Sequence, residues 1–316
     1  MSGKLFKPEK PEIVLHSGDH YYYQTIARLN SCQSIAASHG ILLDIHIDPR
    51  IPVQVCMEAE LVEETLVPLI SQAIEHTPWS RLDIAFSLCN VIGSEFEVEM
   101  NIWGNGCRLR QYENIPYGVM QQNPIANSTS TDNGIPRTVR QQTGNYQLQH
   151  LAITRFKVQR NSERSFSWQV NDPSYEASLL LSNDQALGKR VEAHLERHHI
   201  ITSHADSLTK ACRTIVNNVD EMKYTTVLVD SRLGDKTLSK YASLLRDAAS
   251  PGTRFILLTH NAINHSLIRK YHAAGYFAIV NLESKTELAN AMYASAIFNA
   301  TGSAGKKCST PCAHTN

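Results

Sequence analysis

The sequence lacks the features that would point to a membrane, a nucleic acid or secretion. No apolar run approaches the roughly 20 residues of a transmembrane helix, and the opening MSGKLFKPEKPEIV has no signal-peptide core. Lysine plus arginine and aspartate plus glutamate each total 30, so no polybasic surface is expected. No helix-turn-helix pattern is recognisable. We therefore expect a soluble, cytoplasmic protein with neither a membrane nor a nucleic-acid partner.

The seven cysteines have no metal-ligand spacing over most of the chain, and in a cytosolic protein we expect them to be reduced thiols. Cys308 and Cys312 lie closer together, with His314 beside them. A zinc site would need a fourth ligand and a rigid frame, and this stretch lies in a tail rich in small polar residues. A disordered tail is the favoured interpretation, and a metal or redox site is the alternative.

The chain has 316 residues, 42% of them hydrophobic and 19% charged, which is an ordinary balance for two globular domains. The first part mixes helical and strand patterns, the second alternates them regularly, and Asn171-Asp172-Pro173-Ser174 indicates a linker. The predicted class is α/β throughout. We expect a lead-in at 1–13, a first domain at 14–170, a linker at 171–176, a second domain at 177–299 and a disordered tail at 300–316.

In the first domain, apolar spacing predicts two helices and several strands, the second helix being kinked or split by Pro68. These elements are expected at 19–39, 41–47, 58–75, 82–88 and 95–103. The segment 111–149 has few large apolar residues and is predicted to be a mobile loop, followed by a closing hairpin at 153–158 and 166–170.

In the second domain, five short apolar strands alternate with five helices, which predicts a doubly wound, five-stranded parallel sheet. The strands are expected near 179–181, 200–203, 225–230, 255–259 and 277–280, and the helices near 187–197, 207–216, 238–249, 265–274 and 286–298.

Polar side chains stand where three of these strands end. Strand 179–181 is followed by Ser182-Asn183-Asp184, strand 225–230 ends in Asp230, and strand 255–259 ends in Thr259. The carboxyl ends of parallel strands meet at one edge of the sheet. Two acids and a hydroxyl there would form a pocket suited to a cation and a phosphoryl group.

With this pattern, residues from about 176 to 299 resemble the receiver domain of two-component response regulators. The resemblance implies that Asp230 corresponds to the phosphoacceptor, Thr259 to the switch hydroxyl, and Asn183-Asp184 to the acidic pair that holds Mg²⁺. It also implies a lysine after the fifth strand that contacts the phosphate.

The segment departs from the receiver pattern at several positions. The first acid is the amide Asn183, and Asn281 and Leu282 stand where the lysine is expected; Lys285 belongs to the next helix. The aromatic residue that usually follows the switch is replaced by Ile279. Phosphoryl transfer depends on stabilising the charge of the transferring oxygens, and the lost carboxylate and ammonium weaken that stabilisation. Only a weak Mg²⁺ site at Asp184 and Asp230 would remain.

Residues from about 14 to 170 resemble, by the order of their elements, the ATP-binding domain of sensor histidine kinases, the GHKL ATPase fold. The helix carrying Leu69-Ile70-Ser71-Gln72-Ala73-Ile74-Glu75-His76-Thr77-Pro78 is similar to the N-box of that family. Its Mg²⁺-holding asparagine corresponds here to Gln72, and an upstream asparagine of the box to Pro68. The resemblance implies an α/β sandwich of histidine-kinase ATPase type.

The next motif of that family is Asp-x-Gly-x-Gly, which here reads Ile102-Trp103-Gly104-Asn105-Gly106. An isoleucine cannot accept a hydrogen bond from adenine, and an unpaired polar edge costs about 1–3 kcal/mol. Of the glycine-rich lid motif that follows in that family, only the stretch Thr143-Gly144-Asn145 is left here. Glycines at 104 and 106 are expected to form a turn after a strand, with nucleotide contact as the alternative.

Among the 14 histidines, none lies in a recognisable His-box helix, including His46, His76, His198 and His199, so these are expected to be structural or solvated. Trp103 is expected to be a core residue. The alternative is that Trp103 and the Gln/Asn-rich loop line a site for another small ligand.

These resemblances imply a degenerate hybrid histidine kinase fragment: a pseudo-ATPase domain followed by a pseudo-receiver. The expected role is non-catalytic, two-component signalling through contact with a sensor kinase or response regulator. No cofactor is expected, and ATP is not expected to bind. The face around the last two helices is the candidate docking surface. The alternatives are a receiver phosphorylated on Asp230 through weak Mg²⁺, and an ATP-binding kinase or ATPase. Both a monomer and a homodimer fit the sequence.

Overall fold

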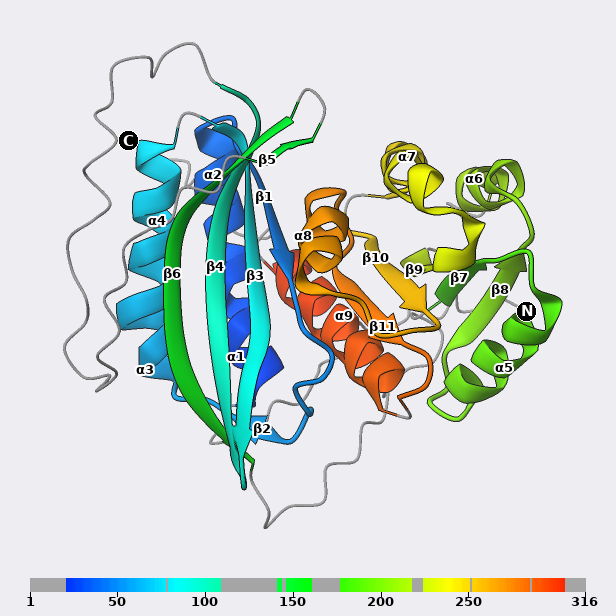
Figure 1. Cartoon of the computed structure of the whole chain (residues 1–316), viewed down its shortest axis with the longest axis horizontal. Helices are drawn as coiled ribbons and strands as arrows, with labels where there is room; N and C mark the ends of the chain where they lie inside the picture. Colours follow the sequence, from blue (N-terminus) through cyan, green and yellow to red (C-terminus); the bar gives the residue numbers. More distant parts are fainter. Residues whose placement is uncertain are drawn as a thin grey trace, which may run out of the picture.

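Two β-sheets, one from each half of the chain, form the framework of the computed structural model (Figure 1). The structure describes residues 21–77, 79–108, 141–143, 146–160, 177–217, 224–250, 252–284 and 286–304. The predicted lead-in and linker, the lid motif around Gly144, the expected strand at 166–170, Lys285 and the cysteines of the tail lie outside these residues.

The first sheet is mixed and has the strand order β1-β3-β4-β6-β2, with the short β5 beside β6. β1 pairs parallel to β3, and the other pairs are antiparallel. The strands are β1 (Leu42–His46), β2 (Val55–Cys56), β3 (Trp79–Ile92), β4 (Glu95–Arg108), β5 (Gln141–Thr143) and β6 (Tyr146–Arg160).

The helices of the first half cover one face of this sheet (Figure 1). They are α1 (Tyr22–Ala27), a 3-10 turn at Arg28–Asn30, α2 (Ser31–Ser38), α3 (Ala59–Leu61), a π-helical turn at Val62–Leu66, and α4 (Val67–His76). β4 explains the layering: its residues 96, 98, 100 and 102 are apolar and buried toward the helices, and the residues between them are mostly polar. A two-layer α/β arrangement is therefore present, and its relation to the histidine-kinase ATPase type stays a prediction.

The predicted interruption at Pro68 is confirmed. Pro68 lies in the first turn of α4, directly after the π-helical turn. Proline has no N–H to donate to the preceding turn, so the regular hydrogen-bond ladder is broken there and the helix widens locally.

Two predictions for β4 and β6 are wrong. The glycines at 104 and 106 lie inside β4, where Gly104 pairs with Leu82 of β3 and Gln149 of β6, and do not form a turn. Part of the expected loop at 111–149 is strand, namely β5 and the start of β6.

β6 was expected to form a hairpin with 166–170, but its described partners are β2, β4 and β5. Opposite charges favour its pairing with β4: Arg155 Nε donates to Glu99 at 2.8 Å, and Lys157 lies 3.0 Å from Glu95.

The second sheet confirms the predicted parallel, doubly wound architecture. Its order is β11-β10-β9-β7-β8, and every pair is parallel. In order of appearance this is 2-1-3-4-5, the flavodoxin-like order. The strands are β7 (Ala177–Leu181), β8 (Ile201–Ala205), β9 (Tyr224–Asp230), β10 (Arg254–Thr259) and β11 (Ala278–Asn281).

Helices cover both faces of the second sheet. The apolar residues of α5 (Gln185–Glu196) and α9 (Glu287–Ala304) share one core cluster, and those of α6 (Leu208–Asn217), α7 (Asp235–Ala248) and α8 (His265–Ala273) belong to the other. The central strands read as continuous apolar runs because both of their faces are buried. α9 runs to Ala304, so the prediction of a disordered tail is wrong for residues 300–304, which are helical.

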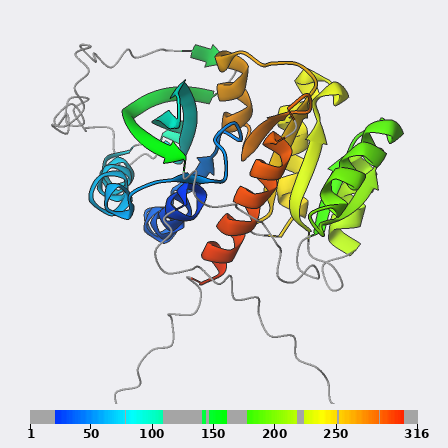
Figure 2. The same cartoon turned by 90° about the horizontal axis from the view of Figure 1, so that it is seen from below.

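The halves are joined by a continuous core. One cluster of buried apolar side chains contains residues of α1, β3 and β4 together with residues of β11 and α9. The Ile47 amide donates to the Phe277 carbonyl at 2.9 Å, which links the first sheet to β11. Figure 2 shows α9 running between the first-half helices and the second sheet.

The predicted docking face is therefore wrong for α9. Ala291, Ala294 and Phe298 of this helix have no exposed surface, and Asn30 of the first half donates to the Phe298 carbonyl at 2.9 Å. The first half of the same chain covers the surface that was expected to meet a partner.

A buried polar cluster lies at this joint. His46 Nε2 is 3.0 Å from Asp83 Oδ1. Arg81 lies 2.7 Å from Asp83 and 2.8 Å from Asp44 and also donates to the carbonyls of Ala273 and His272, in α8. The carboxylates of Asp44 and Asp83 thus contact Arg81, and Asp83 also contacts His46. Arg81 connects the two halves, because it hydrogen-bonds residues of both. His46 is therefore structural, as expected.

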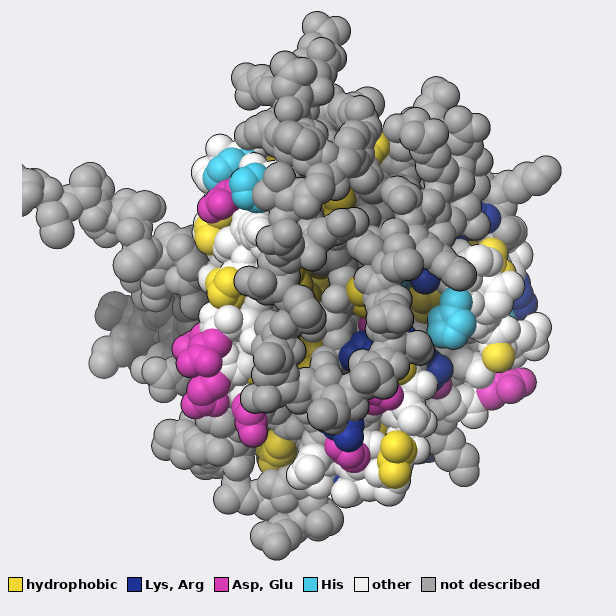
Figure 3. Space-filling view, turned by 60° about the vertical axis from the view of Figure 1, so that its left-hand side comes forward, with side chains coloured by type: hydrophobic (Ala, Val, Ile, Leu, Met, Phe, Trp, Pro, Cys, Tyr) yellow, Lys and Arg dark blue, Asp and Glu magenta, His cyan; other side chains and the backbone are white. Residues whose placement is uncertain are grey.

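No helix in the described ranges is long and apolar enough to cross a bilayer. The face seen in Figure 3 carries grouped acidic side chains at its lower left, and where its residues are described its lysines and arginines do not form one extended patch.

Candidate functional site

The candidate site lies at the carboxyl edge of the second sheet, where β7, β9 and β10 end. The register places Leu258, the neighbour of Thr259, beside Asp230, and Thr259 beside Asn281. The structure thus brings the predicted positions to one edge, because parallel strands in register end together.

Asp230 is fully buried, and hydrogen-bond donors surround its carboxylate. Ser182 Oγ donates to Oδ2 at 2.7 Å, His260 Nε2 lies 3.2 Å from Oδ1, and the Arg232 backbone amide donates to Oδ1 at 3.0 Å. Since a carboxylate only accepts, the His260 proton in this contact is on Nε2. Burial alone would raise the pKa of Asp230, but the hydrogen bonds from Arg232 and Ser182 outweigh it and the pKa is lowered.

The Arg232 guanidinium lies between the two acids of the site. Its terminal nitrogen Nη2 is 2.9 Å from Asp230 Oδ2 and 2.8 Å from Asp184 Oδ2, and its Nε is 3.2 Å from Asp230 Oδ1. Asp184 also caps α5, since its Oδ1 accepts the amides of Ala186 and Leu187. Backbone hydrogen bonds to Asp184 and its contact with Arg232 hold the pKa of Asp184 below its usual value.

The hydroxyl of Thr259, the position predicted to be the switch, is hydrogen-bonded within the sheet and not to Asp230. Thr259 is buried, and its Oγ1 donates to the Val280 carbonyl at 3.1 Å. Asn281, one of the two positions predicted to lack the lysine, ends β11. Its backbone amide donates to the Glu287 carboxylate at 2.8 Å, and its side-chain oxygen accepts from the Glu283 backbone amide. Leu282 packs against the shared core. Neither position supplies a positive charge.

The residues present do not fit a bound Mg²⁺ as the structure stands. A magnesium ion needs free oxygen ligands at about 2.0–2.1 Å. The facing oxygens of Asp184 and Asp230 are instead in contact with the Arg232 guanidinium, and Asn183, the third member of the predicted set, is exposed. In the described ranges no three or more His, Cys, Asp or Glu side chains are arranged to hold a metal.

The positions predicted for a degenerate nucleotide pocket have structural surroundings. Ile102 is completely buried in the core, and Gln72 is exposed on α4. A Cβ placed on Gly104 would lie 2.0 Å from Trp79 Cδ1, so Gly104 is required by the close approach of this ring. Gly106 lies further along β4. Trp103 is 5% exposed, as expected for a core residue, and Arg269 of α8 lies over its ring.

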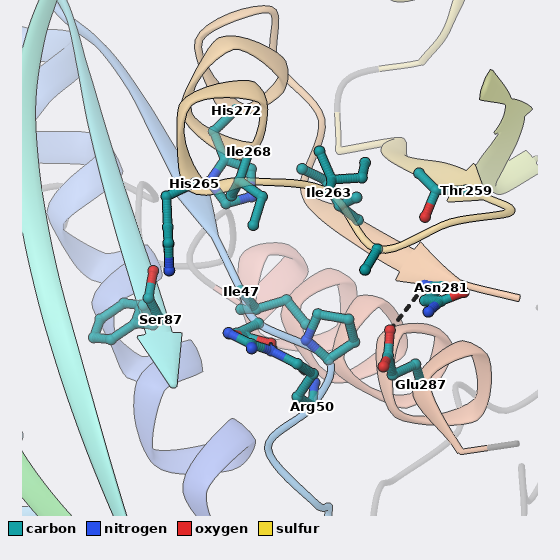
Figure 4. A pocket seen from close by; sticks show the side chains of 15 residues that line it. Ile47, Arg50, Ser87, Thr259, Ile263, His265, Ile268, His272, Asn281 and Glu287 are labelled. Atoms are coloured by element: carbon teal, nitrogen blue, oxygen red, sulfur yellow. Dashed lines mark hydrogen bonds and ion pairs between the residues drawn. The ribbon is translucent and has the colours of Figure 1, made fainter. Parts of the chain in front are cut away.

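A cavity of about 140 Å³ lies between the halves, next to the candidate site. Figure 4 shows Thr259 and Asn281 on one side and Ile47, Arg50 and Ser87 of the first half on the other. Asp230 does not line it. The cavity exists because the first half packs against the carboxyl edge of the second sheet.

Arg232 and His260 were not predicted as site residues. Arg232 stands two positions after a strand-end aspartate and His260 directly follows Thr259, so their nearness to the site could have been inferred from the sequence. Their orientation toward Asp230 could not, because it depends on loop conformation.

Comparisons with known proteins give distant likenesses. No protein-family model and no curated protein matches the chain. Among solved structures, the chain is similar to Vibrio cholerae chemotaxis protein CheY4, with 11% identity over 38% of this chain and 97% of that one and a TM-score of 0.33. It is also similar to the magnesium-bound receiver domain of a Pseudomonas aeruginosa sensor histidine kinase, with 20% identity, coverages of 37% and 94%, and a TM-score of 0.31. A Thermotoga maritima response regulator has 15% identity, coverages of 39% and 98%, and a TM-score of 0.33. Likenesses this distant carry no argument about function.

Proposed function

We propose that this chain is a two-component signalling protein that acts through protein contact and does not transfer phosphate. The observation that carries the proposal is the closed hydrogen-bond shell of Asp230. Its carboxylate accepts from Ser182, from Arg232 and from His260, so both oxygens are engaged inside the protein. A nucleophile in this position would have to break these bonds before attacking phosphorus.

The charges around Asp230 support the same conclusion. A transferring phosphoryl group needs cations or donors aimed at its oxygens. In this site the Thr259 hydroxyl is bonded to Val280, Asn281 carries no charge, and the Arg232 guanidinium is already paired with both acids. The groups that could stabilise the transfer are thus absent from these positions or committed elsewhere.

The first half supports a role without nucleotide chemistry. Ile102 is closed off in the core, and the Trp79 ring occupies the space above Gly104 that a ligand would have to approach. In this proposal the first half is a structural partner of the receiver-like half. The external partner, a sensor kinase or response regulator, docks on a surface other than that of α9.

Phosphorylation is tested by incubating the intact chain with acetyl phosphate and Mg²⁺ and measuring its intact mass, with Asp230→Asn as the matched control. The expected result is no stoichiometric adduct in either protein. An adduct present in the wild type and absent in Asp230→Asn would establish a working receiver and refute the proposal.

Protein contact is tested by cross-linking the tagged chain in cells of its own source and identifying the captured proteins. Enrichment of a sensor kinase or response regulator, repeated with purified proteins, is the expected result, and failure to bind any such protein in the purified assay contradicts the proposal. Calorimetry with Mg-ADP provides a separate test: micromolar binding abolished by Gln72→Ala would favour a nucleotide-binding protein instead.

A further inference from the structure

We infer that Arg232 is a built-in cation that takes the position of a divalent metal ion between Asp184 and Asp230. This inference rests on the proposed function, because it explains why the second half needs neither metal nor phosphate. It predicts that removing the guanidinium turns a site unfit for a metal into one that binds Mg²⁺.

The first argument is geometric. A single nitrogen, Arg232 Nη2, is 2.8 Å from Asp184 and 2.9 Å from Asp230. A cation at the position of this nitrogen would touch both carboxylates; Asp230 ends β9, and Asp184 caps α5 in the loop after the adjacent strand β7. The guanidinium therefore fills the point at which the two negative charges converge.

The second argument is that the backbone holds Arg232 in place. Asp230 is the N-cap of the 3-10 turn Ser231–Leu233 and accepts the Arg232 amide at 3.0 Å. Because the same carboxylate binds both the amide and the guanidinium, the side chain folds back over a short distance. A cation delivered from two residues away has a very high effective concentration, against which a dissolved ion must compete.

The third argument concerns charge. Asp230 has no exposed surface, so an uncompensated carboxylate there would be costly, whereas Asp184 is 30% and Arg232 42% exposed. The ion pair of Arg232 with Asp230 therefore contributes more to compensating buried charge than its ion pair with Asp184. The ion pair with Asp184 is more exposed and is screened by solvent, but it places the second carboxylate against the same guanidinium.

Loss of the guanidinium leaves two converging carboxylates, the buried one without its charged partner. Carboxylate oxygens are the ligands that Mg²⁺ and Mn²⁺ prefer, and water can complete the coordination. The chain thus contains the ligands of a cation site together with the side chain that keeps the cation out.

The experiment compares Mn²⁺ binding by the intact wild-type chain and by Arg232→Ala, using the paramagnetic resonance of free Mn²⁺. The expected result is no saturable binding below millimolar Mn²⁺ for the wild type and at least tenfold tighter binding for Arg232→Ala. The double variant Arg232→Ala/Asp184→Ala should lose the gained binding, which locates it at this pair. Arg190→Ala removes an exposed arginine of α5 and should behave as the wild type.

Arg232→Gln provides a second test should Arg232→Ala unfold, since glutamine retains a donor without the charge. Circular dichroism identifies which variants remain folded. Wild-type binding as tight as that of Arg232→Ala overturns the inference, and so does a folded Arg232→Gln that gains no binding. The acetyl phosphate assay separates the two claims. If one of these binding results is obtained and the wild type is not phosphorylated, this inference fails and the proposed function stands. A phosphorylated wild type refutes the proposed function itself.

Discussion

The imidazole rings of His46 and His272, one from each half of the chain, stack in parallel with their centroids 4.6 Å apart. His46 Nδ1 is 2.7 Å from the Tyr276 carbonyl and its Nε2 is 3.0 Å from an Asp83 oxygen. Both ring nitrogens of His46 thus have a buried oxygen as partner. The ring of His272 lies against the ring of His46, and both side chains are buried.

We expect His272 to make the protein less stable in mild acid. Burial and the neighbouring charge of His46 lower the pKa of His272 well below its ordinary value, about 6.5. Below about pH 6.5 the unfolded chain therefore binds a proton that the folded chain does not, and the free energy of unfolding falls by up to about 1.4 kcal/mol per pH unit. Arg81 and Asp83 also face this cluster.

The measurement is urea unfolding from pH 5 to pH 7.5 for the wild type and His272→Phe, which keeps a ring against His46. The slope of stability against pH should be shallower in the variant. His39→Phe alters an exposed histidine and serves as the control. Equal slopes for the wild type and His272→Phe would rule out this account.

We expect His46→Leu to destabilise the protein by about 3 kcal/mol, because it leaves the buried Tyr276 carbonyl without its donor and removes the His46 contact to Asp83, which keeps Arg81. Chemical denaturation measures the change. His39→Leu, on an exposed position, should change stability by no more than about 0.5 kcal/mol. Comparable effects of the two substitutions would show that the cluster at the joint contributes little.

Gly104→Ala should destabilise the first half by about 1–3 kcal/mol through overpacking. The added Cβ would lie 2.0 Å from Trp79, and the ring must move to admit it. A double-mutant cycle tests the cause: in a Trp79→Ala background the same substitution should cost much less. An unchanged cost in that background would mean that something other than the tryptophan ring demands glycine.

We expect the two halves to unfold together, because α9 belongs to the core of both. Ala294→Glu places a charge on a fully buried position of α9 and should destabilise the chain by about 3 kcal/mol or more. The described tryptophans, Trp79 and Trp103, both lie in the first half, so their fluorescence reports on the half that does not contain the substitution.

The fluorescence midpoint in urea should shift in Ala294→Glu to the same extent as the midpoint from far-ultraviolet circular dichroism. Ala193→Glu, on an exposed position of α5, should change the free energy of unfolding measured by either probe by no more than about 0.5 kcal/mol. Unshifted fluorescence in Ala294→Glu would show that the halves are independent.

The sequence determined the second half well. Its strands are short apolar runs buried on both faces, and amphipathic helices separate them, so each local pattern agrees with the final sheet. The order of strands and helices then requires Asp184, Asp230 and Thr259 to meet at one edge. The kink at Pro68 was equally local, because a missing N–H needs no partner from elsewhere to have its effect.

Only the tertiary structure decided how the site and the surfaces are used. The position of the Arg232 guanidinium depends on loop geometry, and the requirement for Gly104 comes from a ring on another strand. The burial of α9 arises from contacts between residues more than 200 positions apart, such as Asn290 with the Pro49 carbonyl. Periodicity shows that a helix face is apolar, but which element covers it depends on long-range packing that no local pattern records.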